Sequence, residues 1–201
     1  LDAFYTQFGV PVEDGWTVVD IGAGVGDFAI LAAYDGPDVR VYAYEPFPES
    51  YQLLIRNLTL NAISNVTAFQ QAVWREAGTL ALDLSGGEPL QIASRETGGA
   101  GDVFAETVEV QALTLGDVLE GQGLARIDLL KLDCEGAEYP ILLASPPEVL
   151  VRVDRIVMEY HDLDKERNHF RLTAFLEAAG FRVNWRRNIV HDDIGYLFAD
   201  R

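Results

Sequence analysis

Apolar runs of strand length alternate with segments of helical pattern along most of this chain, and this order restricts the fold more than any other feature. The run TVVDIGA at 17–23 is typical of a buried strand, and GDFAILAAY at 26–34 is typical of the helix that follows it. The same order returns in VRVYAYEP at 39–46, which contains a terminating proline, and in the amphipathic segment 48–62. Because parallel strands are joined by crossover helices, the order predicts an α/β fold around a mostly parallel sheet.

The middle of the chain departs from this pattern before the alternation resumes. Segment 65–74 predicts a third strand, and two short β runs flank a glycine-rich stretch between residues 78 and 113. We interpret 78–113 as a β insertion and expect its glycine-rich part to be a mobile surface loop. The later predicted elements are a helix at 114–120, a strand at 127–135, a helix from about 139, a strand at 155–161 and a helix at 164–179 closed by Gly180. The final runs FRVNWRRN and IGYLFADR predict a closing antiparallel pair.

The length of the chain fits this set of elements. Its 201 residues match one domain, since domains hold roughly 100–200 residues. No internal repeat, heptad pattern or low-complexity segment divides it. We therefore predict a single domain over residues 1–201, with a Rossmann-like, doubly wound, mostly parallel sheet, a C-terminal antiparallel strand pair and a small β insertion.

Charge narrows the possible partners. The formal net charge is −17, from 32 acidic and 15 basic residues, and such a surface repels nucleic acid phosphates and anionic membranes. We therefore expect a small or neutral substrate and no nucleic acid or membrane partner. The lone Cys134 excludes an internal disulfide, and no apolar run approaches the ~20 residues that cross a bilayer, which predicts a cytoplasmic protein. Composition leaves the oligomeric state open.

A glycine-rich turn follows the first predicted strand. The segment DIGAGVGDF places Gly22, Gly24 and Gly26 between a strand and a helix, where the backbone can approach a ligand that a Cβ atom would exclude. Glu45 ends the second predicted strand and is well placed to accept hydrogen bonds from both hydroxyls of a ribose. Together the turn and the carboxylate predict a nucleoside cofactor.

The charge around this turn distinguishes between cofactors. A dinucleotide site needs a third glycine at position 27, where this chain has Asp27, and no Arg or Lys lies in the turn. Acidic residues near a pyrophosphate repel it, at about 4 kcal/mol for two like charges 4 Å apart at an effective dielectric near 20. S-adenosylmethionine has no phosphate and carries a sulfonium and an ammonium group, so the acidic strand ends would act as its counter-ions.

The segment LKLDCEGAEYP at 130–140 places further carboxylates at the end of a buried strand. Alternation along a strand predicts that Lys131, Asp133 and Glu135 share one face near the ligand crevice. We expect Lys131 to pair with a neighbouring carboxylate deeper in the sheet. Glu138 stands where a helix N-terminus stabilises an anion, so it is either a helix cap or a substrate contact.

These segments resemble the FkbM-type family of class I S-adenosylmethionine-dependent methyltransferases. The resemblance extends from VVDIGAGVGDFAI through IDLLKLDCEGAEYPIL to GYLFADR, and the K-x-D-x-E-G-x-E run is its most specific element. It implies a methyltransferase, mostly acting on an oxygen of a small molecule or sugar. The residues it implies for cofactor binding are Asp20, Gly22, Ala23, Gly24, Gly26, Glu45, Pro46, Phe47, Gln71, Ala72 and Asp133. By this resemblance Asp20 and the glycine turn hold the methionine part, Phe47, Gln71 and Ala72 flank the adenine, and Asp133 lies near the transferred methyl group.

Methyl transfer to a hydroxyl also needs a group that takes its proton. His161 ends the next predicted strand at the same sheet edge as Glu135, and its ordinary pKa suits a base near neutral pH. His161, Glu135 and Asp133 are therefore the candidate catalytic residues, although His161 could equally be structural. A magnesium-dependent variant would use Asp133, Glu135 and Asp162, but no dedicated metal motif supports it.

Two other functions stay open at this point. One is an NAD-dependent oxidoreductase, which the missing third glycine and the acidic turn disfavour. The other is a protein that binds S-adenosylmethionine without turnover, which would show cofactor affinity and no methyl transfer.

Overall fold

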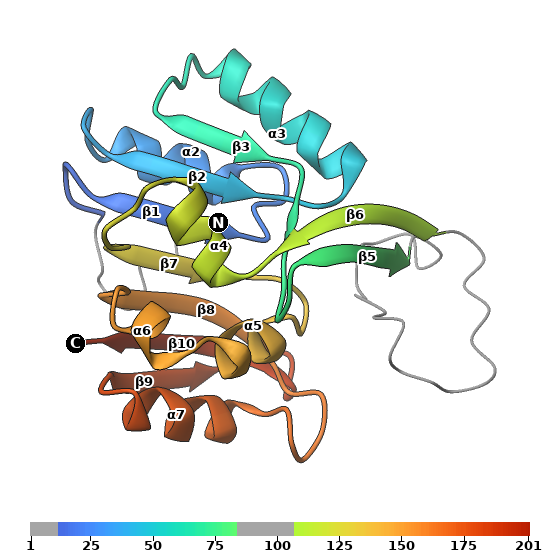
Figure 1. Ribbon diagram of the computed structural model, residues 1–201, viewed down its shortest axis with the longest axis vertical. Coiled ribbons are helices and arrows are strands. Elements are labelled where there is room, and N and C mark those ends of the chain that lie inside the picture. The colour runs from blue at the N-terminus through green and yellow to red at the C-terminus, as the bar shows by residue number, and fades with distance from the viewer. Residues whose placement is uncertain (1–11, 84–106) are drawn as a thin grey trace.

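The computed structural model describes residues 12–83 and 107–201. In these ranges a seven-stranded sheet has the order β3-β2-β1-β7-β8-β10-β9 (Figure 1). Its strands are β1 (Thr17–Ile21), β2 (Arg40–Tyr44), β3 (Val66–Phe69), β7 (Leu129–Leu132), β8 (Arg155–His161), β9 (Arg182–Arg187) and β10 (Ile194–Asp200). The first five strands named pair in parallel, and β10 pairs antiparallel with both β8 and β9. The chain winds outward on one side through β2 and β3 and on the other through β7 and β8, so the winding reverses beside β1.

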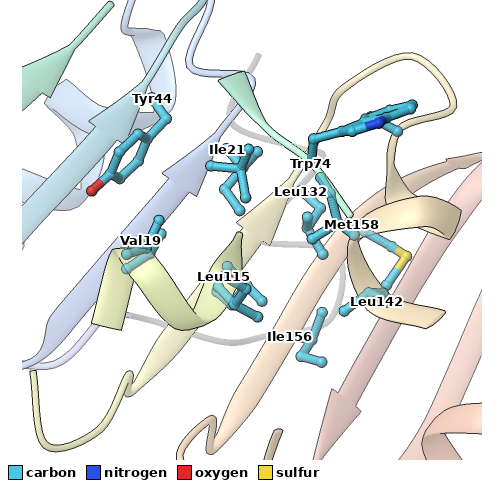
Figure 2. Packing of buried hydrophobic residues seen from close by; sticks show 14 of the residues in the cluster. Val19, Ile21, Tyr44, Trp74, Leu115, Leu132, Leu142, Ile156 and Met158 are labelled. Carbon is cyan, nitrogen blue, oxygen red and sulfur yellow. The ribbon is translucent and has the colours of Figure 1, made fainter. Parts of the chain in front are cut away.

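Helices cover both faces of this sheet, as the predicted doubly wound fold requires. They are α2 (Asp27–Tyr34), α3 (Pro48–Leu60), α4 (Leu115–Gly121), α5 (Glu138–Ala144), α6 (Pro147–Leu150) and α7 (His169–Ala178). Alternate residues of β1 belong to different cores: Val18 packs with α2 and α3, whereas Val19 and Ile21 pack with α4 and α5. Figure 2 shows the second core, in which Leu115 and Leu142 from these helices meet Ile156 of β8.

A second, three-stranded sheet stands at the edge where the parallel strands end. It contains β4 (Ala72–Val73), β5 (Gly78–Asp83) and β6 (Thr107–Leu113) in the order β4-β6-β5 (Figure 1). β5 and β6 pair antiparallel, in agreement with the predicted β insertion. The glycine-rich part of 78–113 lies outside the described residues.

Three predicted boundaries were wrong. Segment 65–74 is not one strand, because the chain leaves the main sheet after Phe69 and joins the small sheet at Ala72. The strand predicted at 127–135 ends at Leu132. The last helix begins at His169 instead of 164, where the side chain of Asn168 accepts a hydrogen bond from the backbone N–H of Arg171 at 3.1 Å. Within the described ranges, no helix combines the length and apolar character needed to cross a bilayer.

Candidate functional site

A cavity of about 280 Å³ opens where β1, β2 and β7 end, at the reversal of the winding. Ligands bind at this position in open α/β sheets. Eight of the residues predicted to bind the cofactor line it: Gly22, Gly24, Glu45, Pro46, Phe47, Gln71, Ala72 and Asp133. The fold therefore brings together four segments that are far apart in the sequence.

The glycines of the turn serve different purposes. A Cβ atom on Gly22 would collide with the backbone carbonyl of Asp133, and one on Gly26 would collide with the side chain of Leu54. Gly24 has a φ of +55° and nothing within 4 Å of the position of a Cβ atom. Gly22 and Gly26 therefore allow the turn to pack against the protein, whereas Gly24 presents bare backbone to open space in the cavity.

Glu45 connects this turn to the end of β2. Its Oε2 accepts a hydrogen bond from the Gly24 N–H at 2.8 Å, and its Oε1 accepts one from the Phe47 N–H at 2.9 Å. Burial raises the pKa of Glu45 to about 7, although the two backbone hydrogen bonds oppose this shift. A carboxylate has about four acceptor positions, so two remain for ribose hydroxyls. Because Glu45 also holds the turn, its replacement will disturb local structure as well as ligand contacts.

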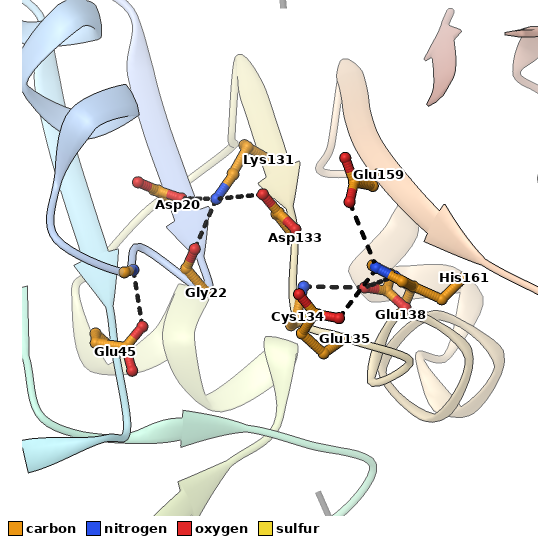
Figure 3. A network of polar contacts seen from close by, with 11 residues as sticks. Asp20, Gly22, Glu45, Lys131, Asp133, Cys134, Glu135, Glu138, Glu159 and His161 are labelled. Atoms are coloured by element: carbon orange, nitrogen blue, oxygen red, sulfur yellow. Dashed lines mark hydrogen bonds and ion pairs between the residues drawn. The ribbon is translucent and has the colours of Figure 1, made fainter. Parts of the chain in front are cut away.

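Asp20 lies beneath the turn instead of in the cavity wall. It is fully buried, and its Oδ1 lies 2.9 Å from the Nζ of Lys131 (Figure 3). The same ammonium donates to the carbonyl of Gly22 at 2.7 Å and lies 3.9 Å from the Asp133 carboxylate. Burial raises the pKa of Asp20, and the charge of Lys131 opposes this shift. The predicted pairing of Lys131 with a deeper carboxylate is confirmed, and Asp20, Ala23 and Gly26 are the predicted cofactor residues that do not line the cavity.

The acidic segment after β7 is a turn and not a continuation of the strand. Glu135 has a φ of +54°, so the prediction that it shares a strand face with Lys131 and Asp133 was wrong. Asp133 and Glu135 nevertheless both line the cavity. Burial raises the pKa of Asp133 to about 6, while Lys131 opposes the shift. Glu138 is the first residue of α5, and its Oε1 accepts a hydrogen bond from the Cys134 N–H at 2.9 Å.

His161 lies outside the cavity wall and is surrounded by carboxylates (Figure 3). Its Nε2 lies 3.2 Å from Glu135 and 3.5 Å from Glu159, and its Nδ1 lies 3.5 Å from Glu138. Burial alone would lower the pKa of His161, but the contacts with Glu135, Glu138 and Glu159 outweigh it and raise the pKa to about 12. A pKa of about 12 favours a protonated ring at neutral pH, which speaks against His161 as the base and leaves its catalytic role a prediction.

The carboxylates considered for magnesium do not converge. Asp162 turns toward α7, where its Oδ1 accepts from the His169 N–H at 2.7 Å and its Oδ2 lies 2.7 Å from the His169 Nδ1. It therefore does not join Asp133 and Glu135 at the cavity. In the part of the chain that the structure describes, no group of three His, Cys, Asp or Glu side chains is arranged to hold a metal ion.

Sequence reasoning missed several residues of the cavity wall. They are Ile21, Tyr44, Ser50, Val73 and Cys134. Ile21 and Tyr44 are the last residues of β1 and β2, so their position at strand ends was a usable signal. Cys134 was interpreted as core packing; it is half-buried, packs against the core and also reaches the cavity. No sequence pattern marks Ser50 or Val73 as cavity residues.

Comparison with known proteins gives consistent matches. Residues 20–183 match the methyltransferase FkbM domain. The chain is 34% identical over 192 residues to methyltransferase sdnD of Sordaria araneosa, covering 83% of this chain and 73% of that protein. It is 30% identical over 207 residues to the 31-O-demethyl-FK506 methyltransferase FkbM of Streptomyces tacrolimicus, covering 90% of this chain and 78% of that protein.

Solved structures show the same fold. Methyltransferase FkbM from Methylobacillus flagellatus KT superposes with a TM-score of 0.66 at 14% identity, covering 98% of this chain and 47% of that chain. The Streptococcus mutans protein SMU.1697c, solved in complex with SAH, superposes with a TM-score of 0.58 at 11% identity, covering 94% and 90%.

Proposed function

Because this chain belongs to the FkbM family of methyltransferases, we propose that it transfers the methyl group of S-adenosylmethionine to a hydroxyl oxygen of a small molecule or sugar. The observation that carries the proposal is the cavity at the ends of β1, β2 and β7, which combines the open backbone of Gly24 with the carboxylates of Glu45 and Asp133. The relative from Streptomyces tacrolimicus is named for methylating an oxygen, which supports a hydroxyl acceptor.

The charges of the cavity wall support this cofactor over a dinucleotide. Three acidic residues line the cavity, namely Glu45, Asp133 and Glu135, and its described lining contains no Lys or Arg. Lys131 lies close by but is buried against Asp20. A pyrophosphate would be repelled here, at about 4 kcal/mol for each pair of like charges 4 Å apart at an effective dielectric near 20. A cofactor with a sulfonium and an ammonium group is attracted instead.

The residues of the wall suit the parts of this cofactor. Glu45 would accept hydrogen bonds from the ribose hydroxyls, Phe47 and Gln71 would flank the adenine, and the Gly24 backbone would lie against the methionine part. S-adenosylmethionine, when bound, supplies a methyl group that the positive charge on its sulfur already activates. The chain's own tasks are to fix the acceptor hydroxyl in line with that group and to receive its proton.

Cofactor identity can be tested by binding alone. Calorimetry should give measurable affinity for S-adenosylmethionine and its demethylated product, and weaker or no affinity for NAD. Gly24→Val should reduce the affinity by on the order of tenfold or more, because its side chain enters the ligand space. The matched control is Gly123→Val, since Gly123 has a φ of +61°, has open space around its Cβ position and does not line the cavity. Tighter binding of NAD, or equal losses in both variants, would contradict the proposed cofactor.

The reaction needs an acceptor. A first probe is 31-O-demethyl-FK506, the compound in the name of the Streptomyces tacrolimicus relative, followed by a panel of hydroxyl-bearing small molecules and sugars. The expected result is formation of demethylated cofactor that depends on the acceptor, with the product heavier by one methylene. Cofactor binding without transfer to any compound of the panel would favour a binding protein.

A further inference from the structure

Three carboxylates from three elements surround the ring of His161. Glu135 comes from the turn after β7, Glu138 from the start of α5 and Glu159 from β8, and they lie 3.2–3.5 Å from the two ring nitrogens. Among the residues that the structure describes, neither ring nitrogen has a hydrogen-bond partner, so these contacts are between charges rather than donor and acceptor. Since carboxylates lie at both nitrogens and the side chain is 10% exposed, the geometry fits an imidazolium.

The backbone at Glu135 is strained. A non-glycine residue in the left-handed region costs roughly 1–2 kcal/mol, and Glu135 has a φ of +54°. Such strain persists only where surrounding contacts fix the conformation, and it is concentrated at functional sites. Here the Cys134 N–H donates to Glu138, which also contacts His161. The ring therefore contacts both the Glu135 carboxylate and the carboxylate that fixes the strained turn.

The side chains of this cluster differ in whether they reach the cavity. The Glu135 side chain is 36% exposed and lines the cavity, whereas His161 does not line it. Asp133 also lines the cavity but lies on the side of Lys131. We propose that protonated His161 is a positioning residue that holds the Glu135 carboxylate at the cavity wall, where Glu135 receives the proton of the acceptor hydroxyl. This proposal rests on the methyltransferase function proposed above.

The proton and the charges balance in this arrangement. The acceptor oxygen forms a bond to the methyl carbon while the carbon–sulfur bond breaks and leaves its electron pair on sulfur. The O–H proton passes to the Glu135 carboxylate and then to water at the exposed side of Glu135. His161 touches no reacting atom and keeps its proton throughout, so it acts only through Glu135.

The first experiment measures the charge of the ring without any acceptor. Carbon-13 labelling of the full chain allows the His161 ring to be followed by NMR, and only three histidines need assignment. The carboxylates beside the ring are Glu135, Glu138 and Glu159, and Tyr196 of β10 interacts with Glu159. We expect no titration of His161 between about pH 6 and about pH 9, the range that covers an unperturbed histidine.

A matched pair of variants assigns the effect to Glu135. Glu135→Gln should lower the midpoint of the His161 titration, because it removes the carboxylate nearest to the ring. Glu148→Gln, an exposed glutamate in the first turn of α6, should leave it unchanged. Titration of His161 near its ordinary pKa in the unmodified protein would overturn the proposal, whether or not an acceptor is known. His161 itself is retained in both measurements, so they do not require a His161 variant to fold.

The second experiment is a double-mutant cycle on methyl transfer. Loss of the proton acceptor in Glu135→Gln should lower kcat by roughly 10²- to 10⁴-fold. His161→Gln should also lower kcat, whereas the affinity for demethylated cofactor should stay within about twofold, because His161 does not line the cavity. If His161 acts only through Glu135, the double variant is no slower than Glu135→Gln alone. Multiplying losses would contradict the positioning role. If no acceptor is ever methylated, the proposed function fails while the ring titration still stands, so the two failures are distinguishable.

Discussion

The proton on His161 should make the stability of the protein depend on pH. The contacts with three carboxylates outweigh burial of the ring and raise the pKa of His161 from 6.5 to about 12 in the folded protein. A group whose pKa is higher in the folded state contributes stability that is complete below its unfolded pKa and is lost as the pH rises toward its folded pKa. The free energy of unfolding should therefore fall steadily above about pH 6.5, the unfolded value.

The size of this effect follows from counting protons. One proton bound only in the folded state gives a slope of about 1.4 kcal/mol per pH unit. Between about pH 7.5 and about pH 9 the unfolded histidine is almost fully deprotonated, so the predicted loss is about 2 kcal/mol. This slope requires only that the folded pKa of His161 lies above the window, and the value of about 12 satisfies that condition. Glu45, with a pKa of about 7, titrates mainly below the window.

Urea denaturation at the two pH values, followed by circular dichroism, measures this loss. In His161→Gln the amide still offers an N–H to the carboxylates but has no proton to lose, so the loss should shrink by about 2 kcal/mol. His191→Gln, which replaces an exposed histidine between β9 and β10, should keep the slope of the unmodified protein. Equal pH dependence in the unmodified protein and in His161→Gln would refute the assignment of the proton to His161.

Two further pairs of substitutions test the strain and the buried ion pair. Ala62→Gly should stabilise the protein by about 0.5–1 kcal/mol in urea denaturation, because it relieves a φ of +53°. Glu135→Gly relieves similar strain but should change stability less, because the contact of Glu135 with the His161 ring is lost, and it should abolish most methyl transfer. Full activity in Glu135→Gly would contradict the role of Glu135. Lys131→Met should lower the free energy of unfolding by about 3–5 kcal/mol, because it leaves Asp20 buried without its cation. Adding Asp20→Asn should recover part of that loss, and Lys165→Met, at an exposed lysine, should have no effect. Unchanged stability of Lys131→Met would contradict the importance of the pair.

The parallel sheet could be predicted from the sequence because its strands are buried on both faces. Such strands are nearly continuous apolar runs, and the helices between them have their own period. The run RIVMEYH gave the bounds of β8 without error, since both ends are marked by polar residues. The carboxyl ends of β1 and β2 could then be placed at one edge, which located Gly24 and Glu45 at a common cavity.

Tertiary contacts decided what the sequence could not show. Nothing in LDCEGAE indicates that β7 stops at Leu132, because a period-two pattern continues past Leu132, where pairing with β1 and β8 stops. The charge of His161 depends on Glu135, Glu138 and Glu159, of which only Glu159 is its near neighbour in the sequence. A pKa inferred from residue type alone is therefore wrong by the contribution of contacts that only the fold creates.

The carboxylates around the cavity outnumber the two cations that contact them, Lys131 and His161. Six acidic residues gather there: Asp20, Glu45, Asp133, Glu135, Glu138 and Glu159. Lys131 neutralises the deepest of them beneath the glycine turn, and His161 neutralises the group at the ends of β7 and β8. Two cations cannot balance six carboxylates, and the raised pKa values of Glu45 and Asp133 show that burial already disfavours their charged forms. Both groups line the cavity, so a positively charged ligand that binds there favours their ionised forms and adds to the positive charge of Lys131 and His161.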